Sequence, residues 1–317
     1  MSTPRPPSVR FAIAFGLAVL LAGCSQPPAE PTPPPEGTPT PPVIGGSGAP
    51  TVVPTLISSE ITVGEERFLF SILDPSTNLP IAAPDREVRV TLTGPNGDTV
   101  DAGEANFVWA IEGERGIYVT NIELPTAGEW TAKFVTEGRS GEKETIPVTF
   151  PVAAESSALE VGEEAPSVET PTLDDVGGEV ARLSTDADPL RALYETSVAD
   201  ALEAGRPFVL AFATPAFCQT AQCGPTLDRL KPFVERYPDV AFINVEPYEL
   251  RWDEAVGGLQ PVTEGDPPEL QTVPAVDRYG ILAEPWVYVV DGDGIVRGSF
   301  ELIFSDAELE AALDTLR

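Results

Sequence analysis

Two cysteines five positions apart carry the most evident chemistry in this sequence. Cys218 and Cys223 lie between a short apolar run at 207–213 and an amphipathic stretch at 226–237. A cysteine pair between a strand and a helix is well placed for thiol–disulfide chemistry, because the N–H groups at a helix N-terminus stabilise a thiolate. In a continuous helix, residues i and i+5 hold their Cα atoms about 8 Å apart, beyond disulfide reach. Part of the segment 218–223 must therefore be non-helical if the disulfide forms.

A third cysteine, Cys24, ends a segment typical of secretion signals. Arg5 and Arg10 precede an apolar run at 11–20, and Leu21-Ala22-Gly23-Cys24 follows it. This ending resembles the lipobox of bacterial lipoproteins, which implies removal of residues 1–23 and lipidation of the Cys24 thiol, for example with palmitate. The other interpretation, an uncleaved anchor helix, requires a longer apolar run. We therefore expect the chain to be lipid-anchored in the cell membrane on its extracytoplasmic face, where Cys218 and Cys223 can oxidise.

The composition excludes several classes of function. The 317 residues carry 19 Lys and Arg against 50 Asp and Glu, a net charge of −31. This charge excludes nucleic acid as an expected partner and disfavours adsorption to anionic membrane surfaces. Histidine is absent and Met1 is the only methionine, so catalysis by histidine, zinc sites with histidine ligands and the His/Met sites of copper proteins are excluded. We expect no metal site and no cofactor.

Shifts in composition divide the rest of the chain into four parts. Residues 24–54 are rich in Pro, Thr, Gly and Ser, which predicts an extended tether. Residues 55–153 show short alternating strands separated by turn residues, which predicts an all-β, immunoglobulin-like sandwich. Residues 154–180 are acidic and predict a linker that runs into the next domain. Residues 181–317 alternate between helix and strand, which predicts an α/β domain.

The expected elements follow from periodicity and turn chemistry. In the β-rich part, strands are predicted at 67–73, 87–93, 106–111, 116–122, 129–135 and 145–150. In the α/β part, the pattern predicts helices at 188–204 and 226–237, strands at 207–213 and 240–245, a surface loop at 247–274, and a hairpin over 286–302. Ser305 and Glu308 have the spacing of a capping box that opens the final helix. We expect Trp109 and Trp130 to lie in the sandwich core.

The C-terminal part, from about residue 162 to 317, resembles the thioredoxin family in the order and spacing of its elements. Tyr279-Gly280-Ile281 is followed by Pro285 at the spacing of that family's cis-proline, which faces the active-site disulfide, and Pro232 also has a counterpart there. The resemblance implies a cis peptide bond before Pro285, where the missing N–H allows a tight turn against the sulfurs. It also implies that the Glu284 backbone hydrogen-bonds an incoming peptide. The other interpretation is a trans proline at the start of a strand.

The cysteines depart from the family pattern. Thioredoxins use Cys-x-x-Cys, whereas four residues separate Cys218 from Cys223. Either Cys218 attacks and Cys223 resolves, or Cys223 takes the place of the first family cysteine and Thr226 replaces the second. The distance from the preceding strand favours Cys218 as the nucleophile. The family's buried acid is missing, because Ala211 and Phe212 lie near its place, so proton transfer needs water or another group.

Three functions follow for this pair. The first is thiol–disulfide exchange with protein thiols or disulfides and a separate redox partner, in a direction that the sequence leaves open. The second is a structural disulfide in a redox-inactive thioredoxin-like domain used for binding. The third is a peroxidase, since the cysteine spacing also resembles atypical two-Cys peroxiredoxins. That family needs a Thr and an Arg where this chain has Pro215 and Pro285, and both losses disfavour the peroxidase.

Overall fold

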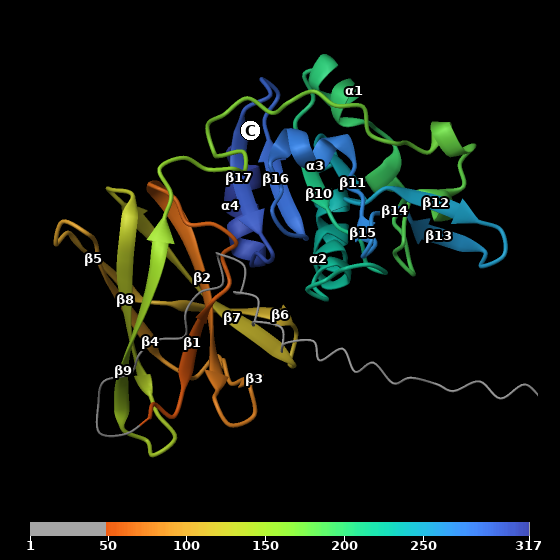
Figure 1. The fold of residues 1–317 in the computed structure, drawn as a ribbon. Coiled ribbons are helices and arrows are strands. Elements are labelled where there is room, and N and C mark those ends of the chain that lie inside the picture. The colour runs from red at the N-terminus through yellow and green to blue at the C-terminus, as the bar shows by residue number, and fades with distance from the viewer. Residues whose placement is uncertain (1–48, 317) are drawn as a thin grey trace, which may run out of the picture. The chain divides into compact units, whose positions relative to one another are not determined.

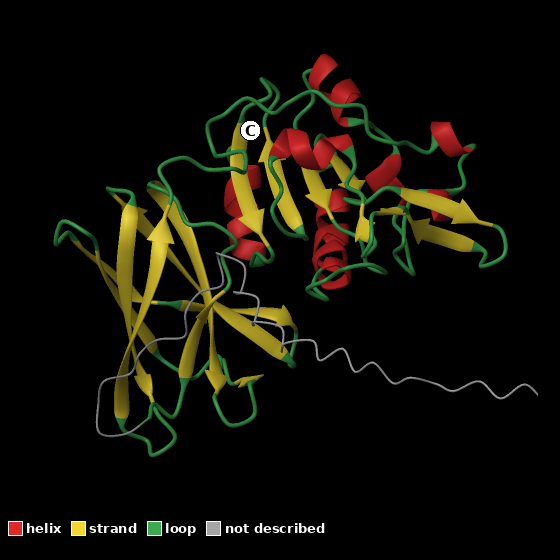
Figure 2. Ribbon diagram, viewed as in Figure 1, coloured by secondary structure: helices red, strands yellow, loops and turns green. Residues whose placement is uncertain are grey.

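The computed structural model describes residues 49–316, all of which belong to one compact unit. The predicted signal segment, Cys24 and most of the predicted tether lie outside the described residues. Figure 1 labels the elements and Figure 2 separates helices from strands. Within residues 49–316, no helix has the length and apolarity needed to cross a membrane.

The N-terminal part of the described chain contains nine strands in two antiparallel sheets. The first sheet has the order β1-β2-β7-β6, with β3 paired to β2, and the second has the order β5-β4-β8-β9. The strands are β1 (Val53–Leu56), β2 (Gly64–Asp74), β3 (Leu79–Pro80), β4 (Val88–Thr93), β5 (Thr99–Glu104), β6 (Asn106–Ile111), β7 (Arg115–Leu124), β8 (Gly128–Glu137) and β9 (Lys143–Val152).

Alternate residues of both sheets fill one shared core. Phe68 and Phe70 of β2 meet Phe134 of β8, with ring centroids 6.4 and 4.8 Å apart. Inward apolar and outward polar residues alternate because side chains on a strand point to opposite faces of the sheet. The two packed sheets are consistent with the predicted immunoglobulin-like sandwich. All six predicted strands are confirmed, whereas the short strands β1 and β3 and the mostly polar strand β5 were not predicted.

The two tryptophans of the sandwich differ in burial. Trp130 is fully buried, and its indole N–H donates to the Thr126 carbonyl at 2.8 Å, so the prediction that it lies in the core is confirmed. Trp109 is only partly buried and packs edge-on against Phe107. The prediction for Trp109 was wrong because β6 is the edge strand of its sheet, so Trp109, on the same face as Phe107, lies at the rim of the shared core and stays partly exposed.

The C-terminal part is built on a four-stranded sheet with the order β11-β10-β16-β17. β10 pairs in parallel with β11 and antiparallel with β16, and β16 pairs antiparallel with β17. These strands are β10 (Phe208–Phe212), β11 (Ala241–Val245), β16 (Trp286–Val290) and β17 (Val296–Glu301). The helices are α1 (Val198–Glu203), α2 (Cys223–Arg236), α3 (Pro274–Tyr279) and α4 (Asp306–Asp314), with 3-10 turns η1 (Asp174–Val176), η2 (Val180–Arg182) and η3 (Arg191–Tyr194).

Helices cover both faces of this sheet, which is why β10, β11 and β16 are buried at every position and apolar at all of them except Asn244. Val209 and Ala211 of β10 pack with α2, α4 and η3, whereas Phe208, Leu210 and Phe212 pack with α1 and α3. A strand buried on both faces shows no alternation of polar and apolar residues. The C-terminal part thus has helices on both faces of a mixed sheet, and the predicted capping box of Ser305 and Glu308 opens α4.

Three predicted segments differ from the structure. The predicted helix at 188–204 is divided into η3 and α1, because Ser197 adopts an extended conformation and caps a new helix. The predicted loop at 247–274 contains two small hairpins, formed by β12 (Leu250–Asp253) with β13 (Gly258–Pro261) and by β14 (Thr263–Glu264) with β15 (Glu269–Leu270). The predicted linker is partly packed, since Ala158 and Ala165 are buried in the core on the α1 and α3 face.

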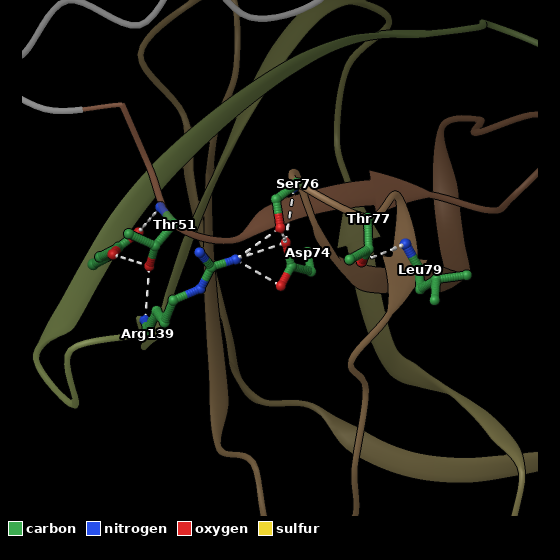
Figure 3. A network of polar contacts seen from close by, with 7 residues as sticks. Thr51, Asp74, Ser76, Thr77, Leu79 and Arg139 are labelled. Carbon is green, nitrogen blue, oxygen red and sulfur yellow. Dashed lines mark hydrogen bonds and ion pairs between the residues drawn. The ribbon is translucent and has the colours of Figure 1, made fainter.

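A polar network ties the end of β2 to the turn between β8 and β9 (Figure 3). Asp74 accepts hydrogen bonds from the hydroxyl and the N–H of Ser76 at 2.6 and 2.8 Å, and both of its oxygens face Arg139 at 2.7 Å. The Ser76 hydroxyl, then the Ser76 N–H, and to a smaller extent Arg139 lower the pKa of Asp74 to about 2. Hydrogen bonds to the ionised carboxylate favour its charged form.

Ser76→Ala is expected to raise the pKa of Asp74 back toward 3.8, and to do so more than Arg139→Gln does. The reason is that the first change removes the hydrogen bond from the Ser76 hydroxyl, the largest cause of the lowered pKa. Arg139 contacts Asp74 directly, but its side chain is 59% exposed, so solvent screens its charge. Carboxyl chemical shifts of Asp74, followed by NMR as the pH is lowered, measure both effects. A larger rise in Arg139→Gln would contradict this order of causes.

Candidate functional site

The disulfide between Cys218 and Cys223 lies at the junction of β10 and α2. Their Cα atoms are 6.0 Å apart, and the segment 218–222 is not helical because α2 begins at Cys223. The prediction that part of 218–223 must leave the helix is therefore confirmed. β10 is central in the sheet and ends at Phe212, so the following turn carries Cys218 to the edge where the parallel strands end. Ligand and reaction sites of α/β sheets are commonly found at this edge.

The two sulfurs differ in accessibility and in their contacts. Cys223 is 0% exposed and points from the first turn of α2 into the core, whereas Cys218 is only partly buried. The Cys223 N–H, at the first turn of α2, donates to the Cys218 Sγ at 3.2 Å, and the Thr220 hydroxyl lies 3.4 Å from the same sulfur. A helix N–H directed at a sulfur stabilises its thiolate. This geometry gives Cys218 the features of an attacking thiol and Cys223 those of a resolving one.

Pro285 and Glu284 lie against the cysteine loop. The peptide bond between them is cis, as predicted, and Pro285 immediately precedes β16. Glu284 is 6% exposed, and its Oε1 accepts the Gln219 N–H at 2.9 Å. The Glu284 carbonyl accepts the Thr220 hydroxyl at 3.0 Å. The backbone of Glu284 was predicted to hydrogen-bond an incoming peptide. In this structure its carbonyl instead accepts a hydrogen bond from the loop between the two cysteines.

Tyr248 completes this side of the site. Its hydroxyl accepts a hydrogen bond from the Gln219 side-chain amide at 2.8 Å. Burial raises the pKa of Tyr248 to about 12, and the neighbouring Glu284 charge acts in the same direction. Tyr248 is thus neutral at physiological pH and supports the loop without adding charge.

A second buried acid, Glu246, lies just beyond β11. Its Oε1 accepts the N–H and the hydroxyl of Thr185 at 2.6 and 2.9 Å, and the Thr185 hydroxyl in turn accepts the Ala216 N–H at 3.1 Å. Burial raises the pKa of Glu246 to about 7, while the hydrogen bonds from Thr185 lower it by less. Glu246 is therefore linked through Thr185 to the turn that precedes Cys218.

The structure brings Cys218, Cys223, Glu284 and Pro285 together, although the sequence predicted only a backbone role for Glu284. The side chains of Glu284, Tyr248 and Glu246 were missed as parts of the site. One signal was present for Glu246, which directly follows the apolar run 240–245 and so had to lie near the buried end of a strand. No comparable signal marks Glu284 or Tyr248, because their positions depend on how separate loops meet.

Two sulfurs and one carboxylate oxygen gather at this site. The Sγ atoms of Cys218 and Cys223 and an oxygen of Glu284 lie within 4.8 Å of one another. The sulfurs are bonded to each other, so neither is available as a thiolate ligand in this state, and we assign no metal to the group. The arrangement instead places a carboxylate beside a disulfide.

Comparisons with known proteins give no family. No protein-family model and no curated protein matches the chain. Among solved structures, a DUF4426 family protein from Pseudomonas aeruginosa PAO1 is 8% identical with a TM-score of 0.25, and covers 33% of this chain and 91% of that chain. The PmoD soluble domain from Methylocystis is 16% identical with a TM-score of 0.21, over 33% of this chain and 94% of that chain. Murine CRIg is 12% identical with a TM-score of 0.21, over 33% and 99%.

Proposed function

We propose that the C-terminal part of this chain is a thioredoxin-like domain that performs thiol–disulfide exchange through Cys218 and Cys223. The observation that carries the proposal is the disulfide at the junction of β10 and α2, beside Glu284 and the cis peptide bond of Pro285. The sheet order β11-β10-β16-β17, with β10 parallel to β11 and a C-terminal hairpin and helix, supports the proposed fold.

The exchange takes place in two steps. The Cys218 thiolate attacks one sulfur of a partner disulfide, the partner S–S bond breaks, and a partner thiolate leaves. The Cys223 thiolate then attacks the Cys218 sulfur of the mixed disulfide, which forms the Cys218–Cys223 bond and releases the second partner thiolate. Two electrons pass from the protein dithiol to the partner, and the same steps in reverse oxidise a partner dithiol.

The proposed location follows from the sequence. Lipidation of Cys24 would hold the domain at the extracytoplasmic face of the membrane, where a disulfide persists. The separate redox partner is then a protein or small thiol that reaches the same face. The net charge of −31 keeps the exposed domains soluble and apart from anionic lipid surfaces.

The reduction potential of the pair tests the proposed exchange. We expect a value above about −300 mV, measured by equilibration with dithiol buffers and alkylation of the free thiols, together with catalysed reduction of a model protein disulfide. Cys24 is replaced by Ser in these experiments, so that Cys218 and Cys223 are the only thiols that can react. A much lower potential without any exchange would overturn the proposal.

A structural disulfide is the second candidate. It is favoured by the complete burial of Cys223 and by the two hydrogen bonds that hold the loop on Glu284. In this case the domain would bind a partner through another surface, and the pair would stay oxidised in the potential measurement.

A further inference from the structure

The exchange needs a group that accepts a proton from the buried cysteine. Ala211 and Phe212 leave no acid on β10 near the disulfide, and Cys223 is 0% exposed, so bulk water does not reach its sulfur. We infer that the Glu284 carboxylate takes the proton from the Cys223 thiol when the mixed disulfide is resolved, and returns it when the pair is reduced. This inference rests on the proposed exchange function.

The position of Glu284 supports this role. One of its oxygens lies within 4.8 Å of both sulfurs, and among the described residues it is the carboxylate grouped with them. Glu246, the other buried acid in this region, directs its Oε1 to Thr185 instead. The Gln219 N–H holds Oε1 of Glu284 at 2.9 Å, so the acid is fixed to the loop that joins the two cysteines.

The surroundings also suit transfer of a proton. The titratable groups that face Glu284 are the two cysteines, from the loop and α2, and Tyr248, from the segment between β11 and β12. Tyr248 is neutral, so it does not compete for the proton. A carboxylate and a thiolate this close repel each other, which favours states in which one of them carries the proton. Deprotonation of Cys223 by Glu284 therefore moves one negative charge within the site without adding a second.

When the mixed disulfide is resolved, one proton moves from sulfur to oxygen and one S–S bond replaces another. The S–H bond of Cys223 breaks and its proton forms an O–H bond with Glu284. The Cys223 sulfur then forms its bond to the Cys218 sulfur, and the bond between Cys218 and the partner sulfur breaks. The partner leaves as a thiolate, and the Glu284 proton passes to the exposed loop side, where Gln219 lies in solvent.

Single-turnover kinetics of Glu284→Gln test the inference, because Gln keeps an oxygen that accepts the Gln219 N–H. The reduced full chain carrying Cys24→Ser is mixed with glutathione disulfide, and acid-quenched mass spectrometry follows the mixed and intramolecular disulfides. We expect resolution of the mixed disulfide to slow by about 100-fold at pH 6, with a smaller loss at higher pH, where the thiol needs less help to lose its proton. The first attack by Cys218 is expected to keep its rate or to become faster, since a nearby negative charge is gone.

Glu235→Gln is the matched control, because it removes one exposed carboxylate from α2, the helix that begins at Cys223. It should leave both steps unchanged. The pKa of the Cys223 thiol, measured by thiolate absorbance in Cys218→Ser, gives a second readout and should fall when Glu284→Gln is added. An unchanged resolution rate and pH profile, or equal slowing of both steps at every pH, would overturn the role of Glu284. Absence of any exchange in the unmutated chain would instead refute the proposed function.

Discussion

Cys223→Ser is expected to accumulate a mixed disulfide on Cys218, whereas Cys218→Ser accumulates little or none. Cys218 is the more accessible sulfur and receives the N–H at the start of α2, while Cys223 is fully buried. Removing the intramolecular thiol should lengthen the life of the mixed disulfide by at least about 1,000-fold, since the second attack becomes bimolecular. Non-reducing electrophoresis and mass spectrometry after reaction with a model protein disulfide measure the trapped species.

Both variants carry Cys24→Ser, and the double variant Cys218→Ser with Cys223→Ser is the control for non-specific trapping. If Cys218→Ser traps the partner and Cys223→Ser does not, the roles of the two cysteines are reversed. That result would support the alternative register, in which Cys223 takes the place of the first cysteine of the family. Trapping by neither variant favours the structural disulfide.

Glu246→Gln is expected to stabilise the fold at alkaline pH. Glu246 is 8% exposed, and burial raises its pKa from 4.5 to about 7, so the folded state favours the neutral carboxyl group. A difference of this size corresponds to at most about 3 kcal/mol of unfolding free energy. Gln is neutral at every pH and can keep the hydrogen bonds from Thr185. Urea denaturation of both proteins between pH 4 and 8 measures the difference.

The sign of the pH dependence follows from the direction of the shift. Since the folded pKa of Glu246 is raised, its contribution to stability is fully present below pH 4.5 and is lost as the pH rises through about 7. The unmutated chain and Glu246→Gln should therefore be closest in stability near pH 4 and furthest apart near pH 8. Glu249→Gln, an exposed change three residues along the chain, should show no such divergence. A loss of stability in Glu246→Gln at pH 8 would contradict the prediction.

Strong local patterns made most of the fold predictable. Alternating residues identified six of the nine strands of the sandwich, and largely apolar runs identified β10, β11 and β16. Other elements were less predictable, because β1, β3 and the hairpins at 250–270 have few residues, and because β5, although six residues long, has few apolar side chains. The helix expected at 188–204 was interrupted by the cap at Ser197, a local hydrogen bond that periodicity alone does not reveal.

In the candidate site, too, some features could be predicted from the sequence and others could not. The sequence by itself determined the cysteine pair and its place between a strand and a helix, because these depend on residue type and spacing along the chain. The cis peptide bond before Pro285 was implied only by the resemblance to thioredoxins. Only the tertiary structure decided that Cys223 is the buried sulfur, that the loop at 219–222 hydrogen-bonds Glu284, and that a Glu284 carboxylate oxygen lies within 4.8 Å of both sulfurs. The physical reason is that these contacts join residues up to 66 positions apart, from Cys218 to Glu284. Packing of the sheet and its helices brings such residues together, and no local pattern records it.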